Sequence, residues 1–152
     1  MNLSEQVLRL KKLMFESQDD FPISASGNIN SPYGMEVFIN NQNNSKIAKT
    51  CIIDFNNGMS LSSSLNGFMK DKNEDFSKDV YFFGADVSQD YKRIGLGTKL
   101  MNECKNLCLL ENYQKAYTII NKKNEASNGM VSKLGYKLID ESPDELLYIL
   151  TF

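Results

Sequence analysis

VSQDYKRIGLGTK, residues 87–99, is the segment around which the predicted fold is organised. The run before it, residues 80–87, is too apolar to face water on both sides and predicts a central strand. Gly84 inside this run predicts either a bulge or a close approach of another backbone. After a polar turn, Gly95 and Gly97 open a segment whose apolar residues recur at helical spacing. The sequence therefore predicts a strand, a tight loop and the start of a helix.

The glycine pair makes this helix start suitable for binding an anion. Peptide N–H groups in the first turn of a helix lack intrahelical partners and carry the positive end of the helix dipole. Glycine also lets a bulky anion approach the backbone without meeting a Cβ atom. The alternative is that Gly95 and Gly97 only shape a sharp turn. Two common phosphate loops are excluded, because Leu100 stands where a dinucleotide-binding loop has its third glycine and the P-loop spacing is absent.

The spacing of the glycines resembles the pyrophosphate loop of the GNAT superfamily of N-acetyltransferases, R/Q-x-x-G-x-G/A after a strand ending in valine. Here the loop reads Lys92-Arg93-Ile94-Gly95-Leu96-Gly97, with lysine in place of arginine or glutamine. A second family motif, N-x-x-S/A-x-x-L-Y-x-K-x-G-F/Y, resembles a later segment. Its residues here are Asn124, Ser127, Met130, Val131, Lys133, Gly135 and Tyr136. The resemblance covers roughly residues 78–150.

This resemblance implies an acetyl-CoA site within residues 80–136. Backbone N–H groups of residues 93–98 would hold the pyrophosphate, and the backbone of residues 86–89 would pair with the pantetheine arm. Asn124 matches a side-chain contact to pantetheine, although it would serve equally as a helix N-cap. Ser127 is a weaker match, since a small residue there also allows close packing. The cofactor-binding residues predicted in this way are Val87, Ser88, Gln89, Lys92, Arg93, Ile94, Gly95, Leu96, Gly97, Thr98, Asn124 and Ser127.

The resemblance implies transfer of an acetyl group from acetyl-CoA to a primary amine of a small molecule or protein. Acyl transfer to an amine needs a neutral amine, a donor for the tetrahedral oxyanion and departure of the thiolate. Asp86, at the end of the central strand, is the first candidate for the base, with Asp54 and Glu36 in reserve. The backbone N–H of Val87 is the oxyanion donor by the family's pattern. Solvated, outward-facing positions are the alternative interpretation of these carboxylates.

The sequence departs from the family at Val131. Many members have a tyrosine there that protonates the leaving thiolate, and valine cannot do so. Tyr136 is the predicted substitute, with Tyr117 and Tyr33 as alternatives. A thiol of pKa about 8.5 is a tolerable leaving group without an acid, and positioned proton transfer typically contributes about 10²- to 10⁴-fold. The departure therefore predicts a slow step or another acid, and does not by itself predict inactivity.

Composition limits the other possibilities. At 152 residues the chain predicts one domain, residues 1–152, with a sizeable core, and a net charge of −2 gives no basic footprint for nucleic acid. The absence of histidine excludes Ser-His-Asp and Cys-His catalysis, and the spacing of the three cysteines fits no zinc framework, so we predict no metal. The lack of a signal sequence and of a long apolar run predicts a soluble, cytoplasmic protein that does not bind a membrane.

The remaining segments complete an α/β fold resembling that of the GNAT family, with a mixed central sheet of about six or seven strands flanked by helices. Residues 1–17 predict an amphipathic helix, and the polar residues 18–32 predict a loop. Asn56-Asn57-Gly58 between two β-prone runs predicts a hairpin. The other predicted elements are strands at 33–40, 115–120, 136–141 and 146–150, helices at 95–112 and 125–134 with Gly135 ending the second, and a charged loop at 69–79.

Three functional hypotheses remain open from the sequence. The first is the acetyltransferase, whose acceptor amine and acyl-chain preference no sequence cluster identifies. The second is a module that binds acyl-CoA but is catalytically weak or inactive, because of Val131. The third is an assembly protein or homodimer that docks through residues 1–17, although this helix would equally pack on its own domain.

Overall fold

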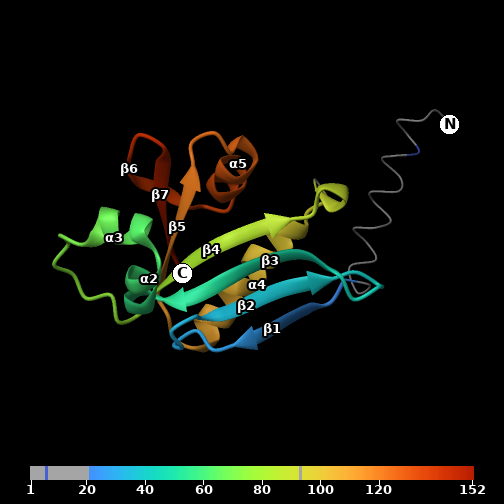
Figure 1. Ribbon diagram of the computed structural model, residues 1–152, viewed down its shortest axis with the longest axis horizontal. Helices are drawn as coiled ribbons and strands as arrows, with labels where there is room; N and C mark the ends of the chain where they lie inside the picture. The colour runs from blue at the N-terminus through green and yellow to red at the C-terminus, as the bar shows by residue number, and fades with distance from the viewer. Residues whose placement is uncertain (1–5, 7–20, 93) are drawn as a thin grey trace.

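The computed structural model describes Gln6, residues 21–92 and residues 94–152, and is built on a seven-stranded sheet (Figure 1). The strand order is β1-β2-β3-β4-β5-β7-β6. All neighbouring strands are antiparallel except β4 and β5, which are parallel. The predicted mixed α/β sheet is therefore confirmed. The strands are β1 (Ile23–Gly27), β2 (Met35–Asn40), β3 (Lys46–Asp54), β4 (Asp79–Val87), β5 (Lys115–Asn121), β6 (Lys137–Glu141) and β7 (Glu145–Thr151).

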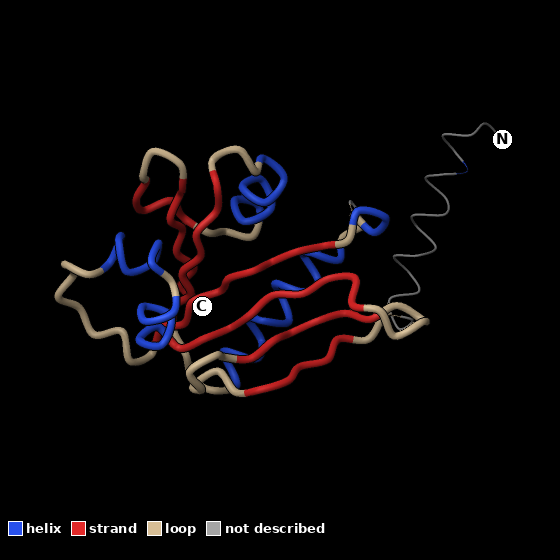
Figure 2. Tube along the Cα trace, viewed as in Figure 1, coloured by secondary structure: helices blue, strands red, loops and turns tan. Residues whose placement is uncertain are grey.

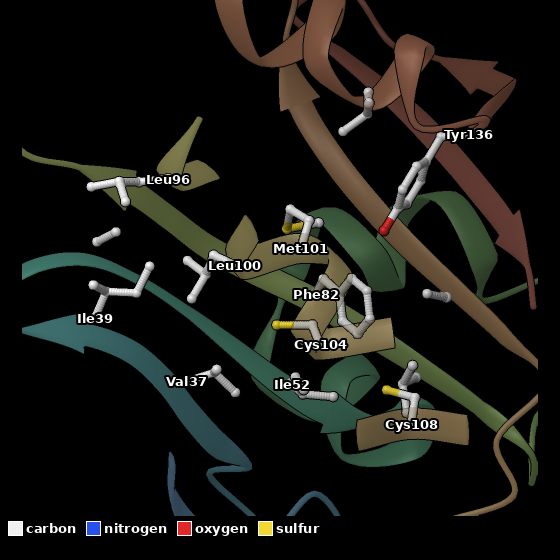
Figure 3. Close-up of a cluster of buried hydrophobic side chains, with 14 of the residues drawn as sticks. Val37, Ile39, Ile52, Phe82, Leu96, Leu100, Met101, Cys104, Cys108 and Tyr136 are labelled. Carbon is white, nitrogen blue, oxygen red and sulfur yellow. The ribbon is translucent and has the colours of Figure 1, made fainter. Parts of the chain in front are cut away.

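Helices cover both faces of the sheet and divide the core into two clusters. α4 and α5 pack on one face, over a cluster that contains Phe82 and Leu100 (Figure 3). α2 and α3 pack on the other face, over a cluster that contains Tyr81 and Tyr117. Successive side chains of a strand point to opposite faces, so β4 supplies both clusters. The helices are α2 (Phe55–Leu61), α3 (Ser63–Met69), the 3-10 helix η2 (Gln89–Tyr91), α4 (Leu96–Leu110) and α5 (Glu125–Lys133).

β4 and β5 separate part-way along their length. Residues 79–82 of β4 pair with residues 115–118 of β5. Beyond this point β4 pairs, among the described strands, with β3 alone. Figures 1 and 2 show β5 turning away from β4 here. We call the diverging ends, residues 83–87 of β4 and residues 119–121 of β5, the fork.

Gly84 forms the predicted bulge at the start of the fork. Between the pairs Cys51–Phe83 and Lys49–Asp86, β4 contains one residue more than β3. Gly84 has a φ of 68°, in the left-handed region that glycine adopts at little cost. The extra residue bends and twists β4 just where it leaves β5.

Two predictions for the N-terminal half of the chain are wrong. The hairpin expected at residues 56–58 is instead the first turn of α2. Asp54 caps this helix by accepting a hydrogen bond from the Asn57 N–H at 2.9 Å, and Phe55 is buried, so the cap and the core override the turn preference of Asn-Gly. The loop expected at residues 18–32 contains β1, an edge strand whose small polar side chains carry no buried-strand pattern.

The other predicted strands and helices are confirmed within a few residues of their expected ends. Gly135, with a φ of 91°, follows α5 as predicted. The helix expected at residues 1–17 lies outside the described residues, apart from Gln6, and so does Arg93. No helix in the described part of the chain is long and apolar enough to cross a membrane.

Candidate functional site

The end of β4 directs one peptide group into the fork. The Ser88 N–H donates to the Ile47 carbonyl oxygen at 2.7 Å, which makes Ser88 and Ile47 a hydrogen-bonded pair. Val87 lies opposite Ala48 in the next pair. Hydrogen-bonded and non-hydrogen-bonded pairs alternate in an antiparallel ladder, so the N–H and C=O of Val87 point away from β3 and toward the fork. The N–H of Ser88, in contrast, is already used by β3.

The start of α4 offers backbone N–H groups to an anion. Gly95 is the N-cap residue, with a left-handed φ of 87°, and no side chain of the described residues caps the helix. The first turn contains no acidic residue. Thr98 in this turn and Lys92 just before it are exposed, and the Lys99 Nζ donates to the Phe21 carbonyl oxygen at 3.1 Å. Uncapped N–H groups at the positive end of a helix, with lysines beside them, favour a bound anion.

Gly97 brings together α4, α5 and the end of β4. A Cβ atom on Gly97 would lie 3.0 Å from the Met130 Sδ of α5 and 3.8 Å from the Val87 Cγ2 of β4. The first turn of α4 therefore packs directly against both elements, and the absence of a side chain allows this close approach. A larger residue at position 97 would disturb the packing of α4 on α5, whatever its effect on a ligand.

α5 begins after the carboxyl end of β5. In the same way, η2 and α4 follow the carboxyl end of β4. Asn124 is the N-cap of α5, because its Oδ1 accepts from the Ser127 N–H at 3.1 Å. The N-cap interpretation is thus confirmed, and it uses only the oxygen of the Asn124 amide. Asn128 fixes the same loop by donating from Nδ2 to the carbonyl oxygens of Asn121 at 3.0 Å and Asn124 at 2.9 Å. Its Oδ1 accepts from the Tyr148 hydroxyl at 2.8 Å.

Nothing in the sequence singles out Asn128. It occupies a variable position of the family motif, and its partner Tyr148 lies on β7. A buried tyrosine, such as Tyr148 at 5% exposure, needs a partner for its hydroxyl, and this is the one general signal that points to a polar contact here. It does not identify the partner.

Of the three candidate bases, Asp86 is the one at the fork. It is exposed and lies opposite Lys49, which places its side chain on the sheet face away from α4. Asp54 instead caps α2. Glu36 is on β2 and forms an ion pair with Lys46. The two reserve carboxylates therefore have structural partners elsewhere in the sheet.

Tyr136 lies in the core. It is 6% exposed, and its hydroxyl points into the cluster that contains Met101 and Phe82 (Figure 3). Burial raises the pKa of this phenol above its ordinary value of about 10, which makes it a poorer acid. Val131 is buried in the same cluster at 1% exposure, and the alternative Tyr117 is buried at 2%. The structure does not support Tyr136 or Tyr117 as the acid that protonates the thiolate.

These features occur together in a known family of enzymes. Residues 16–136, more than half of the chain, match the model of the acetyltransferase (GNAT) family. This chain belongs to the GNAT family. Membership in the GNAT family supports acyltransferase activity for this chain, and the GNAT fold binds acetyl-CoA. No curated protein matches this GNAT chain in sequence.

Solved GNAT structures resemble this one in fold. The ribosomal-protein-S18-alanine N-acetyltransferase of Escherichia coli is 12% identical, with a TM-score of 0.57 over 83% of this chain and 71% of that chain. The PaiA N-acetyltransferase of Thermoplasma acidophilum, solved with coenzyme A, is 10% identical, with a TM-score of 0.56 over 98% of this chain and 72% of that chain. The IAA acetyltransferase of Bacillus cereus is 11% identical, with a TM-score of 0.59 over 79% of each chain. At these identities the likeness shows the fold alone.

Among the described residues, no group of three or more cysteine, aspartate or glutamate side chains could hold a metal ion.

Proposed function

We propose that this protein transfers an acetyl group from acetyl-CoA to a primary amine. The observation that supports the proposal most is the fork, where the Val87 peptide group points into the opening between two parallel strands. The uncapped start of α4 packs against the same residue, since Gly97 lies beside the Val87 side chain. A peptide group for a pantetheine arm and N–H groups for a pyrophosphate are therefore neighbours, as one elongated thioester ligand requires.

Acetyl-CoA supplies the acetyl group as a thioester, and the protein binds it mainly through its backbone. The N–H groups of residues 96–98 hold the pyrophosphate, and Lys92 and Arg93 add positive charge that solvent screens. The C=O of Val87 accepts from the pantetheine arm, and the Asn124 Nδ2 donates to it. Ser127 is small enough to allow this approach.

The other predicted loop residues support the site indirectly. Ser88 is bonded to β3 through its N–H, and Gln89 begins η2. Ile94 packs against the core cluster and so anchors the loop just before Gly95. These contacts fix the path of the chain from β4 to α4, which the backbone donors need.

Asp86 and Val87 carry the chemistry in this proposal. Asp86 takes a proton from the ammonium form of the acceptor, because only a neutral amine attacks a carbonyl carbon. The new C–N bond forms as the carbonyl oxygen becomes an oxyanion, and the Val87 N–H donates to that oxygen. The nitrogen of the tetrahedral intermediate loses its extra proton to solvent, and the C–S bond breaks to leave the amide. The departing thiolate takes a proton from solvent, since its conjugate thiol has a pKa of about 8.5.

Calorimetric titration with acetyl-CoA tests where the ligand binds. Thr98→Glu puts a carboxylate in the first turn of α4, where it favours the helix but repels a pyrophosphate. Thr98→Gln is the matched neutral control. We expect saturable binding by the wild type, about tenfold weaker binding by the Glu variant at low salt, and binding within about twofold of wild type by the Gln variant. A folded wild type that does not bind, or equal binding by all three proteins, would contradict the proposal.

Turnover is a separate measurement, since the burial of Val131 favours a second candidate function. In this second candidate function, the domain binds acyl-CoA but does not turn it over. For the enzyme, we expect release of the CoA thiol to depend on both acetyl-CoA and an amine from a panel of acceptors. Saturable binding with no thiol release on any amine would instead select the binding module.

A further inference from the structure

Two threonine hydroxyls meet consecutive carbonyl groups at the point where the fork begins. The Thr118 Oγ1 of β5 donates to the Phe82 carbonyl oxygen at 3.0 Å. The Thr50 Oγ1 of β3 donates to the Phe83 carbonyl oxygen at 3.2 Å. Thr118 is 7% exposed and Thr50 is 0% exposed. Both hydroxyls are therefore buried and donate hydrogen bonds to the backbone of β4.

These bonds lie where the backbone ladders are irregular. Phe82 and Thr118 form the last pair between β4 and β5. Thr50 lies in the register shift of β3, opposite the bulge at Gly84. A buried carbonyl without a partner costs about as much as a lost hydrogen bond, and at these two irregular positions each hydroxyl provides a donor from outside the ladder.

We propose that Thr118 and Thr50 are positioning residues that hold the fork open for acetyl-CoA, an inference that rests on the proposed function. The Phe82 and Phe83 carbonyls each accept a hydrogen bond from a threonine side chain at the point where β4 leaves β5. The bulge is fixed on its β3 side at the same time. The Val87 peptide group, just beyond the bulge, is then presented to the ligand in one orientation.

The hydroxyl, and not the volume of the side chain, is the feature that this role needs. Valine has nearly the shape of threonine but cannot donate, so Thr118→Val removes the side-chain donor to the Phe82 carbonyl. Serine keeps the donor and loses a methyl group. A packing role predicts that serine is the worse replacement, because it leaves a cavity. A positioning role predicts that valine is the worse replacement.

The experiment compares acetyl-CoA binding by the two Thr118 variants at a temperature where both are folded. We expect the dissociation constant to rise about tenfold in Thr118→Val and to stay within about twofold of wild type in Thr118→Ser. Thr50→Val and Thr50→Ser provide the same comparison at the bulge, and replace the Thr118 pair if its valine variant does not fold. Melting temperature is measured alongside, because a structural role alone would change it without changing binding.

Each outcome has a distinct meaning. Weak binding by the valine variants with rescue by serine supports the positioning role. Binding by folded valine variants within about twofold of wild type overturns it and leaves the proposed function intact, as does weaker binding by serine than by valine. A folded wild type that binds no acetyl-CoA overturns the proposed function, and the positioning role with it.

Discussion

The two halves of β4 belong to one strand and have opposite surroundings. Residues 79–82 are buried and pair with β5, and residues 80–82 pair with β3 as well. Residues 83–87 are exposed or half-buried and lie beside the fork. The bulge at Gly84 falls within this second half, close to the boundary. A single strand thus provides both the centre of the core and the peptide group offered to a ligand.

This difference shows that the candidate site depends more on how the fold orients backbone groups than on the identity of its side chains. Val87 contributes backbone atoms, and its orientation follows from the antiparallel ladder with β3. The first half of β4 anchors that ladder in the core. Changes in the first half should therefore reduce stability most, whereas changes in the second half should cost less stability and act mainly on activity or binding.

The largest effect should come from the buried half. Phe82→Ala removes a ring that is 1% exposed and should lower the free energy of unfolding by about 3–5 kcal/mol, measured by urea denaturation. Phe83→Ala is the matched change across the boundary, and should lower it by less than half as much, because Phe83 is only half-buried and stacks on Tyr81 with ring centroids 5.5 Å apart. Equal losses for the two variants would remove the distinction between the halves.

A smaller effect, on rate alone, should come from Asp86. Asp86→Asn keeps the shape of the side chain and removes the base, so kcat should fall about hundredfold with the unfolding free energy unchanged. Asp90→Asn, an exposed change in η2, is the control and should leave kcat near that of wild type. If the Asp86 variant turned over at the full rate, the carboxylate would be a solvated strand end.

The rate of thiol labelling compares the surroundings of the two halves of β4, because each half has a cysteine beside it. Cys51 lies opposite Phe83, and burial together with Glu36 raises the pKa of its thiol above the ordinary value. Its alkylation rate should rise about tenfold from pH 7 to pH 8 and keep rising at pH 9, because the reactive thiolate stays the minor form. Cys104 shares a cluster with Phe82, and burial raises its pKa to about 12.

In the native protein Cys104 and the equally buried Cys108 should therefore stay unlabelled. Mass spectrometry of the alkylated protein should find one modified site, and none in Cys51→Ser. A labelling rate that levels off below pH 8.5, or modification of Cys104 before unfolding, would contradict the environments described for these thiols.

The smallest effect should come from Tyr136. Its hydroxyl points into the core and not into the fork, so Tyr136→Phe should change kcat by less than about twofold (Figure 3). Steady-state rates with saturating acetyl-CoA measure this directly. A loss comparable to that of Asp86→Asn would show that the phenol does reach the reaction, and that the core interpretation is wrong.

The sequence was most informative where local patterns and local partners agree. The aromatic run of β4, the bulge at Gly84 and the helix end at Gly135 were all predictable, because each depends on residues close together in the chain. Prediction from the sequence failed where a single capping or pairing contact overrode the local residue pattern. Asp54 caps α2 and turns an expected hairpin into a helix, and β1 is a strand only because β2 pairs with it.

The parts of the candidate site that the sequence could not predict depend on contacts between distant segments of the chain. The glycine motif located the α4 start and the end of β4, since both are contiguous segments. Thr118 and Thr50 donate to carbonyl groups of a strand far away in sequence, and no local pattern marks a threonine as such a donor. The burial of Tyr136 could not be predicted for a related reason, because it depends on how α4 and α5 pack.

Amide NMR during titration with acetyl-CoA is the direct test of whether the ligand binds at the Val87 peptide group and the start of α4. It observes the backbone of both halves of β4 in one experiment. We predict that the amide resonances of Val87 and of Gly97 and Thr98 in the first turn of α4 shift and saturate together. Those of residues 80–82, in the buried half, should move little. Saturable binding that leaves Val87 and the α4 start unchanged, or that shifts residues 80–82 most, would contradict the account.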